Sequence, residues 1–163
     1  MGRVFLAEDT KLKRKVALKF LPERVSMDAT ELQRFEYEAQ SAAALNHPNI
    51  AQVYAFEEVN DLSFIAMEYV NGKELRELIE EGQLTVDQKV EITRQIAEGI
   101  RTAHAARIIH RDIKSANVMI DQQGRPRIMD FGLARVEGEA HITKTGTTLG
   151  YNLVHVTRTV ERG

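Results

Sequence analysis

The sequence predicts an α+β fold, in which a β-rich half with one helix precedes a helical half that carries a small hairpin. The first 70 residues hold short apolar runs of strand length, separated by turn residues. Two longer segments, one in each half, repeat apolar side chains at the 3.6-residue spacing of an amphipathic helix. After Asn71-Gly72 helical patterns dominate, so we expect a hinge at this dipeptide.

Four runs in the first half predict strands, at residues 3–8, 15–21, 51–58 and 62–68. A helix is predicted over residues 29–45. One face of that helix carries Leu32, Phe35, Ala39, Ala42 and Ala43. We expect the helix to stop before Pro48, because a proline disfavours helical backbone in the residue that precedes it.

The second half begins with a short predicted helix over residues 74–81, which ends at Gly82. Thr85 is a candidate N-cap for a long helix that continues to about residue 106. We expect the apolar stripe of this helix to be core: Ile92, Ile96, Ile100 and Ala103. Two short strands are predicted after it, at residues 118–120 and 126–129.

The composition is that of an ordinary soluble globular chain, with 43% hydrophobic and 28% charged residues among 163. No window approaches the ~18 apolar residues of a membrane-spanning helix. The net charge of -2 gives no basic surplus that would demand a nucleic acid or a membrane surface. The absence of cysteine excludes disulfides, thiolate metal sites and a cysteine nucleophile. It is compatible with a reducing cytoplasm, where we expect the protein to be.

Polar residues suited to phosphoryl transfer gather in one short stretch, H-R-D-I-K-S-A-N at residues 110–117, followed by D-F-G at 130–132. Phosphoryl transfer needs a carboxylate to receive the proton of the nucleophile and a cation near the moving phosphoryl group. It also needs oxygen ligands for Mg²⁺. Residues of these types are Asp112, Lys114, Asn117 and Asp130.

These motifs, with V-A-L-K at residues 16–19, resemble those of eukaryotic-type Ser/Thr protein kinases, most closely the bacterial members. The resemblance implies a bilobal protein-kinase-like fold. Residues 1–70 would form the N-lobe and residues 71–150 a partial C-lobe. It also implies transfer of the γ-phosphate of ATP to Ser or Thr hydroxyls of protein substrates, with ATP and Mg²⁺ as cofactors.

The resemblance implies a role for each matching residue of the catalytic machinery. Lys19 would contact the α- and β-phosphates, with Glu38 as its ion-pair partner. Asp112 would be the catalytic base and Lys114 would lie near the γ-phosphate. Two further residues would hold Mg²⁺, namely Asn117 and Asp130.

Nucleotide-binding residues carry over in the same way. The backbone of Glu68 and Val70 would bind adenine, beside Met67 at the gatekeeper position, and Glu74 would contact the ribose. The apolar residues around the adenine ring would be Val4, Ala17 and Met119. Of the family's glycine-rich loop only Gly2 remains, because the first two glycines and the leading strand are absent.

A Thr-rich segment supplies candidate autophosphorylation sites, at Thr143, Thr145, Thr147 and Thr148. A phosphate there could pair with Arg111. The same segment could instead be a plain surface loop.

For several residues, an ordinary structural role without catalysis or ligand binding remains an alternative. Lys19 could be a solvated strand lysine, and Glu36 or Glu31 could replace Glu38 as the functional helix acid. Asp112 and Asn117 could be turn formers. We expect His110 to be a packed, hydrogen-bonded structural residue.

Two other functions remain as alternatives. The chain could be a catalytically inactive nucleotide-binding kinase fragment or scaffold. A small-molecule phosphotransferase of the aminoglycoside-kinase type is disfavoured, because those relatives lack the paired H-R-D-x-K and D-F-G pattern.

The tail, residues 151–163, departs from the family pattern, which would continue G-T-x-x-Y-M-S-P-E-Q after Leu149. We expect it to have no partner element. Permitted codons for the tail, read one base later, encode T-T-W-Y-M-S-P-E-Q-L-N-A. The tail is therefore a candidate product of a shifted reading frame.

The nucleotide sequence of the gene tests this interpretation. We expect those codons directly after the codon of Gly150, and a kinase-like open frame downstream in the shifted frame. Different codons, or no such downstream frame, would contradict it.

Overall fold

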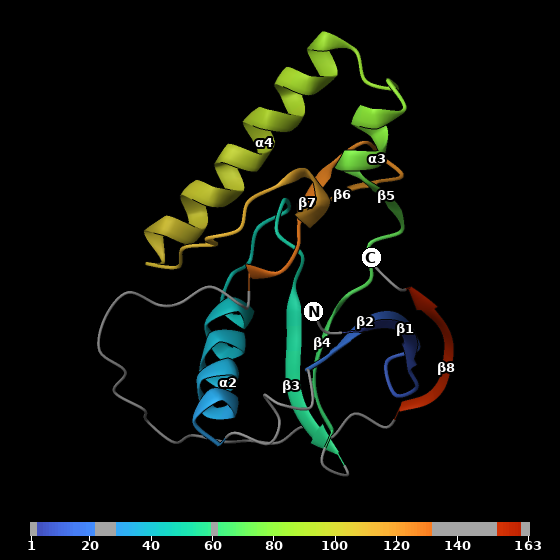
Figure 1. The fold of residues 1–163 in the computed structure, drawn as a ribbon, viewed down its shortest axis with the longest axis vertical. Helices are drawn as coiled ribbons and strands as arrows, with labels where there is room; N and C mark the ends of the chain where they lie inside the picture. Colours follow the sequence, from blue (N-terminus) through green and yellow to red (C-terminus); the bar gives the residue numbers. More distant parts are fainter. Residues whose placement is uncertain (1–2, 22–28, 60–61, 132–152, 161–163) are drawn as a thin grey trace. The chain divides into compact units, whose positions relative to one another are not determined.

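The computed structural model describes residues 3–21, 29–59, 62–131 and 153–160, and these divide into two compact units (Figure 1). The first unit takes its described residues from 1–43, 53–69 and 138–163. The second takes them from 44–52 and 70–137. The α+β class predicted from the sequence is confirmed: among the described residues, the first unit has a sheet and one helix, and the second unit has most of the helical residues.

The first unit is built on a five-stranded sheet with the order β3-β4-β2-β1-β8. All neighbouring strands are antiparallel. Four of the strands are those expected from the sequence, with ends that differ by at most two residues: β1 (Val4–Asp9), β2 (Arg14–Phe20), β3 (Val53–Val59) and β4 (Leu62–Glu68).

One face of this sheet is an apolar core of buried side chains, namely Ala7, Val16, Leu18, Phe64 and Ala66. The opposite face receives α2 (Ala29–Ala43), because the Phe35 ring lies 6.3 Å from the ring of Phe56 on β3. Phe56 pairs with Ile65 on the neighbouring strand β4, and Ile65 pairs in turn with Lys19 on β2. Directly paired residues share a face of a sheet, so Lys19 lies on the face that α2 covers.

The expectation that the tail lacks a partner element is wrong. Residues of β8 (Leu153–Val160) pair with β1 at the edge of the sheet, with Val160 opposite Val4 and two shifts of register (Figure 1). Five of its eight residues are Val or Thr, which favour extended backbone. An edge strand such as β1 offers unpaired backbone groups to such a segment. No local signal in the sequence names the strand that it will join.

The second unit combines a three-stranded sheet of order β5-β6-β7 with two α-helices. Its elements are β5 (Gly72–Glu74), α3 (Leu75–Glu80), α4 (Val86–Ala105), a 3₁₀ turn (Ser115–Asn117), β6 (Val118–Asp121) and β7 (Pro126–Ile128). Leu75, Ile92, Val118 and Ile120 form a buried cluster in this unit, and Ile96 packs against it. Ala103 is also buried, so the predicted stripe of α4 is confirmed at these three positions, while Ile100 is half-buried. The sequence analysis missed β5, since three residues carry too little pattern to reveal a long-range pairing.

The two ends of α4 are held by local hydrogen bonds. At its start, Thr85 Oγ1 accepts from Gln88 N at 3.2 Å and Gln88 Oε1 accepts from Thr85 N at 2.9 Å, so the predicted N-cap is confirmed. At its end, Arg107 has a left-handed φ of 61° and its N–H donates to the carbonyl of His104. Within the described residues, no helix combines the length and apolar character needed to cross a membrane.

The segment after α2 packs within the second unit through Asn49. Its side-chain amide donates to Gln95 Oε1 and to the Pro126 carbonyl, both at 3.0 Å. Its backbone carbonyl accepts from Ile128 N at 2.8 Å. A β-carbon at Gly99 would lie 3.0 Å from Ile128 Cδ1 on β7, so the absence of a side chain there allows α4 to approach β7 closely.

Gly72 allows β5 to lie against β6, and its replacement tests this pairing. A β-carbon there would lie 1.9 Å from the Ile120 carbonyl oxygen, so Gly72→Ala must push the strands apart. We expect a loss of about 3 kcal/mol or more in the free energy of unfolding, measured by urea denaturation. Gly124→Ala is the control. It changes a glycine at φ 77° with no atom within 4 Å, and should cost only about 1–2 kcal/mol. Equal losses in the two variants would contradict the close approach.

Candidate active site

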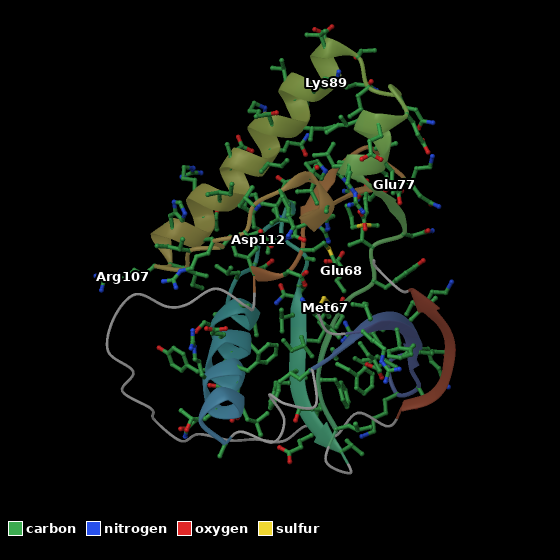
Figure 2. All side chains as sticks on the ribbon, viewed as in Figure 1. Met67, Glu68, Glu77, Lys89, Arg107 and Asp112 are labelled. Carbon is green, nitrogen blue, oxygen red and sulfur yellow. The ribbon has the colours of Figure 1, made fainter. Side chains whose placement is uncertain are left out.

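The loop between α4 and β6 brings three of the predicted catalytic residues into contact. Lys114 Nζ lies 2.8 Å from Asp112 Oδ2, and Asn117 Nδ2 lies 3.0 Å from the same oxygen. The Asn117 amide also donates to the backbone carbonyl of Asp112 at 2.8 Å. The carboxylate of Asp112, labelled in Figure 2, is 63% exposed and is therefore open to a substrate.

The pKa of Asp112 lies below its ordinary value because Lys114 donates a hydrogen bond to its carboxylate, followed by a second bond from Asn117. Asp112 is therefore ionised at neutral pH and can accept a hydrogen bond from a hydroxyl group. A carboxylate of low basicity takes a proton only late in a reaction. This suits phosphoryl transfer, whose loose transition state needs little help from a strong base.

His110 connects the Asp112 loop to the segment that carries Asp130. Its Nδ1 accepts from the backbone N–H of Asp112 at 3.3 Å, so the ring proton is assigned to Nε2, which donates to the Met129 carbonyl at 2.7 Å. The ring also meets Phe131 edge to face at 4.7 Å. The expectation of a buried structural histidine is confirmed.

Two residues of this region have left-handed backbone, Arg111 with a φ of 66° and Asp130 with a φ of 64°. Such conformations cost about 1–3 kcal/mol each and persist where surrounding contacts over-determine them. Those contacts are the hydrogen bonds of the His110 ring to the Asp112 N–H and to the Met129 carbonyl. The Met129 N–H adds a bond to the Asn117 carbonyl at 2.8 Å.

The two predicted metal ligands carry oxygen donors of the kind that Mg²⁺ prefers. The amide nitrogen of Asn117 donates to Asp112, so the Oδ1 atom of Asn117 lies on the other side of that amide group. Asp130 contributes a half-buried carboxylate. It follows Ile128 by two residues, and the backbone N–H of Ile128 donates to the Asn49 carbonyl. The donor set therefore fits a magnesium ion. The described residues contain no group of three or more His, Asp and Glu side chains that would form a separate metal centre.

Two predicted nucleotide-binding residues of the second unit are direct neighbours. Glu74 on β5 pairs with Met119 on β6, so the two side chains share one face of the small sheet. Glu74 is buried, and its Oε2 lies 3.2 Å from Nη2 of Arg76. Val70, also buried, precedes this strand.

The remaining described residues of the predicted nucleotide site lie on the sheet of the first unit. Ala17 pairs with Met67, and Val4 pairs with Lys19, which is two residues from Ala17. These four therefore share the face that α2 covers. Glu68 pairs with Val16 and belongs to the opposite face, next to Met67 at the end of β4 (Figure 2).

Burial separates Glu38 from the alternative acid Glu36 on the same helix. Glu38 is 7% exposed, whereas Glu36 is exposed and bonded to Gln40. Glu38 follows Phe35 by three residues, so it lies on the side of α2 that meets the sheet. Arg34 Nε lies 3.4 Å from its Oε1.

Some predicted residues lie outside the part of the chain that the structure describes. These are Gly2 and the four threonines of the candidate phosphorylation segment, Thr143, Thr145, Thr147 and Thr148.

The sequence analysis missed three residues that hold the site together. Arg34 could have been found from its four-residue spacing to Glu38. No comparable signal exists in the sequence for Arg76, which lies beside Glu74, or for Asn49, which lies between α4 and β7. Their contacts form only when the chain folds.

Lys114→Met tests the electrostatics of this loop. Removing the ammonium group should raise the pKa of Asp112 towards its ordinary value, because the largest cause of the lowered pKa is lost. Carbon-13 NMR titration of the aspartate carboxyl groups measures this change. Arg94→Met, on the exposed face of α4, is the matched control and should leave the pKa of Asp112 unchanged. An unchanged pKa in Lys114→Met would show that the contact does not form in solution.

Comparison with known proteins places this arrangement in a family. The protein kinase domain family matches residues 1–153. A probable serine/threonine-protein kinase of Streptomyces coelicolor is 44% identical over 152 residues, covering 90% of this chain and 23% of that protein. Serine/threonine-protein kinase PrkC of Bacillus subtilis is 42% identical, covering 92% of this chain and 23% of that protein.

Solved structures agree with the sequence relatives. The crystal structure of the Mycobacterium tuberculosis PknI kinase domain matches with a TM-score of 0.72 and 31% identity, covering 83% of this chain and 56% of that chain. The chain thus spans about a quarter of the length of its curated relatives and just over half of a solved kinase domain. The motifs, the fold and these similarities together establish that the chain belongs to the protein kinase domain family.

Proposed function

We propose that this chain is part of the catalytic domain of an ATP- and Mg²⁺-dependent protein kinase that phosphorylates Ser and Thr hydroxyls of proteins. The observation that carries the proposal is the convergence of Lys114 and Asn117 on the carboxylate of Asp112, at 2.8 Å and 3.0 Å. The family membership of the chain and the names of its relatives support the same activity.

In the proposed reaction, the ionised Asp112 accepts a hydrogen bond from the substrate hydroxyl and orients its oxygen towards the γ-phosphate. It takes the proton as the new P–O bond forms and the bond from the γ-phosphorus to the β,γ-bridging oxygen breaks, which releases ADP. Lys114, already beside Asp112, offsets the charge that develops on the transferred group. When bound, Mg²⁺ would neutralise phosphate charge, and its proposed ligands are Asn117 and Asp130.

Roles in nucleotide binding are proposed for the residues that match the family's motifs. Lys19, oriented by Glu38, would bind the α- and β-phosphates. The backbone of Glu68 and Val70 would bind adenine, and Glu74 would bind the ribose. The remaining apolar contacts would come from Val4, Ala17, Met67 and Met119, with Gly2 near the phosphates.

We further propose the domain limits and setting that the sequence analysis predicts. Residues 1–150 would be a partial catalytic domain with an N-lobe at 1–70 and a partial C-lobe at 71–150, and residues 151–163 a tail outside the family pattern. The end of the family match at residue 153 supports this limit. The protein would act in the cytoplasm and autophosphorylate in the Thr143–148 segment.

A second candidate is a nucleotide-binding fragment without transfer activity. Both candidates require ATP to bind, and only the first requires transfer.

Labelled phosphate transfer separates them. With γ-labelled ATP, Mg²⁺ and a Ser/Thr-containing protein, we expect transfer by the unchanged chain. Asp112→Asn should lower transfer by about a hundredfold or more, since it removes the proton acceptor, while ATP affinity measured by calorimetry stays nearly constant. Arg94→Met is the control for substitution of a surface charge and should transfer normally. Binding of ATP without transfer would favour the inactive fragment, and the absence of both would contradict the proposed kinase function.

A further inference from the structure

Arg76 lies beside the acid proposed to contact the ribose, and its location is unusual for a helix. It is the second residue of α3, where the partial positive charge of the helix start disfavours a cation. Glu74 occupies the N-cap position of the same helix, yet its side chain makes no capping hydrogen bond. An acid at an N-cap commonly bonds the first backbone N–H groups. Here the carboxylate is directed to Arg76 instead, with Nη2 3.2 Å from Oε2.

Glu74 is much more buried than Arg76. Its side chain is 10% exposed, and burial of a polar group is unfavourable unless the group has hydrogen-bonding or ionic partners. A carboxylate has about four acceptor positions, so an ion pair at Oε2 is compatible with a sugar hydroxyl at the same group. The pairing of Glu74 on β5 with Met119 on β6 fixes the backbone of Glu74. The ion pair with the guanidinium of Arg76 then favours one direction of the Glu74 side chain.

We propose that Arg76 is a positioning residue that orients the Glu74 carboxylate towards the ribose hydroxyls, and so sets the preference of this site for ribonucleotides over deoxynucleotides. This inference rests on the proposed function, because it assumes that the ribose binds at Glu74. Arg76 itself does not touch the nucleotide in this arrangement. Its effect must therefore pass through Glu74 and must depend on the sugar hydroxyls.

Calorimetric binding of two nucleotides in the presence of Mg²⁺ tests the proposal on the full chain. The probes are ATP and 2′,3′-dideoxy-ATP, which lacks both hydroxyls. Arg76 is about half exposed, so its pair with Glu74 should act weakly. We expect Arg76→Met to weaken ATP binding about twofold to fivefold and to leave dideoxy-ATP binding unchanged. Arg76→Lys, which keeps the charge, should recover most of the ATP affinity.

A double-mutant cycle separates positioning from a general effect of charge. In the Glu74→Ala background, the further change Arg76→Met should have no effect on either nucleotide, because the group through which Arg76 acts is gone. Arg94→Met, an arginine of the same unit that is also ion-paired to glutamate, is the matched control and should bind both nucleotides like the unchanged chain.

Each other outcome overturns a stated claim. If Arg76→Met weakens both nucleotides equally, or still acts when Glu74 is alanine, Arg76 acts on the phosphates or on stability and the positioning role is wrong. If the unchanged chain prefers ATP and Arg76→Met keeps the full preference, only this inference fails. If the unchanged chain binds neither nucleotide, the proposed function fails, and this inference fails with it.

Discussion

The imidazole of His110 is the constraint on which the geometry of the candidate active site depends. One ring nitrogen accepts from the backbone of Asp112, and the other donates to the carbonyl that immediately precedes Asp130. A single buried ring therefore holds together two loops that are far apart in the sequence. Neither loop belongs to a helix or a sheet that would otherwise fix it, so the distance between the two carboxylates depends on this bridge.

This bridge also explains how strained backbone survives next to Asp112 and at Asp130. Left-handed conformations at Arg111 and Asp130 are unfavourable for residues with a side chain. Hydrogen bonds of Asp112 and Met129, which are the neighbours of these two residues, restrict the backbone, so the strain is retained in the folded unit. The result is a short loop in which Lys114 and Asn117 reach the same carboxylate oxygen, and their hydrogen bonds keep Asp112 ionised.

Periodicity and turn chemistry were sufficient to locate most elements of the fold. The stripes on α2 and α4, the N-cap at Thr85 and the strand-length runs of β1 to β4 are local patterns, and the structure agrees with them. The two strands that were missed, β5 and β8, acquire their identity from a distant partner. Three residues of β5 are recognisable as a strand only beside β6, and β8 only beside β1.

The candidate site divides in the same way. The candidate residues for the chemistry were evident from the sequence alone, because Asp112, Lys114, Asn117 and Asp130 stand in motifs whose spacing reflects a short loop and a short hairpin. The distant groups that surround them were found only in the folded structure: His110 bonds to the Met129 carbonyl, and the Met129 N–H bonds to the Asn117 carbonyl. The physical reason is that a motif is set by neighbours along the chain. A buried hydrogen bond or ion pair is set by neighbours in space, which exist only once the chain has folded.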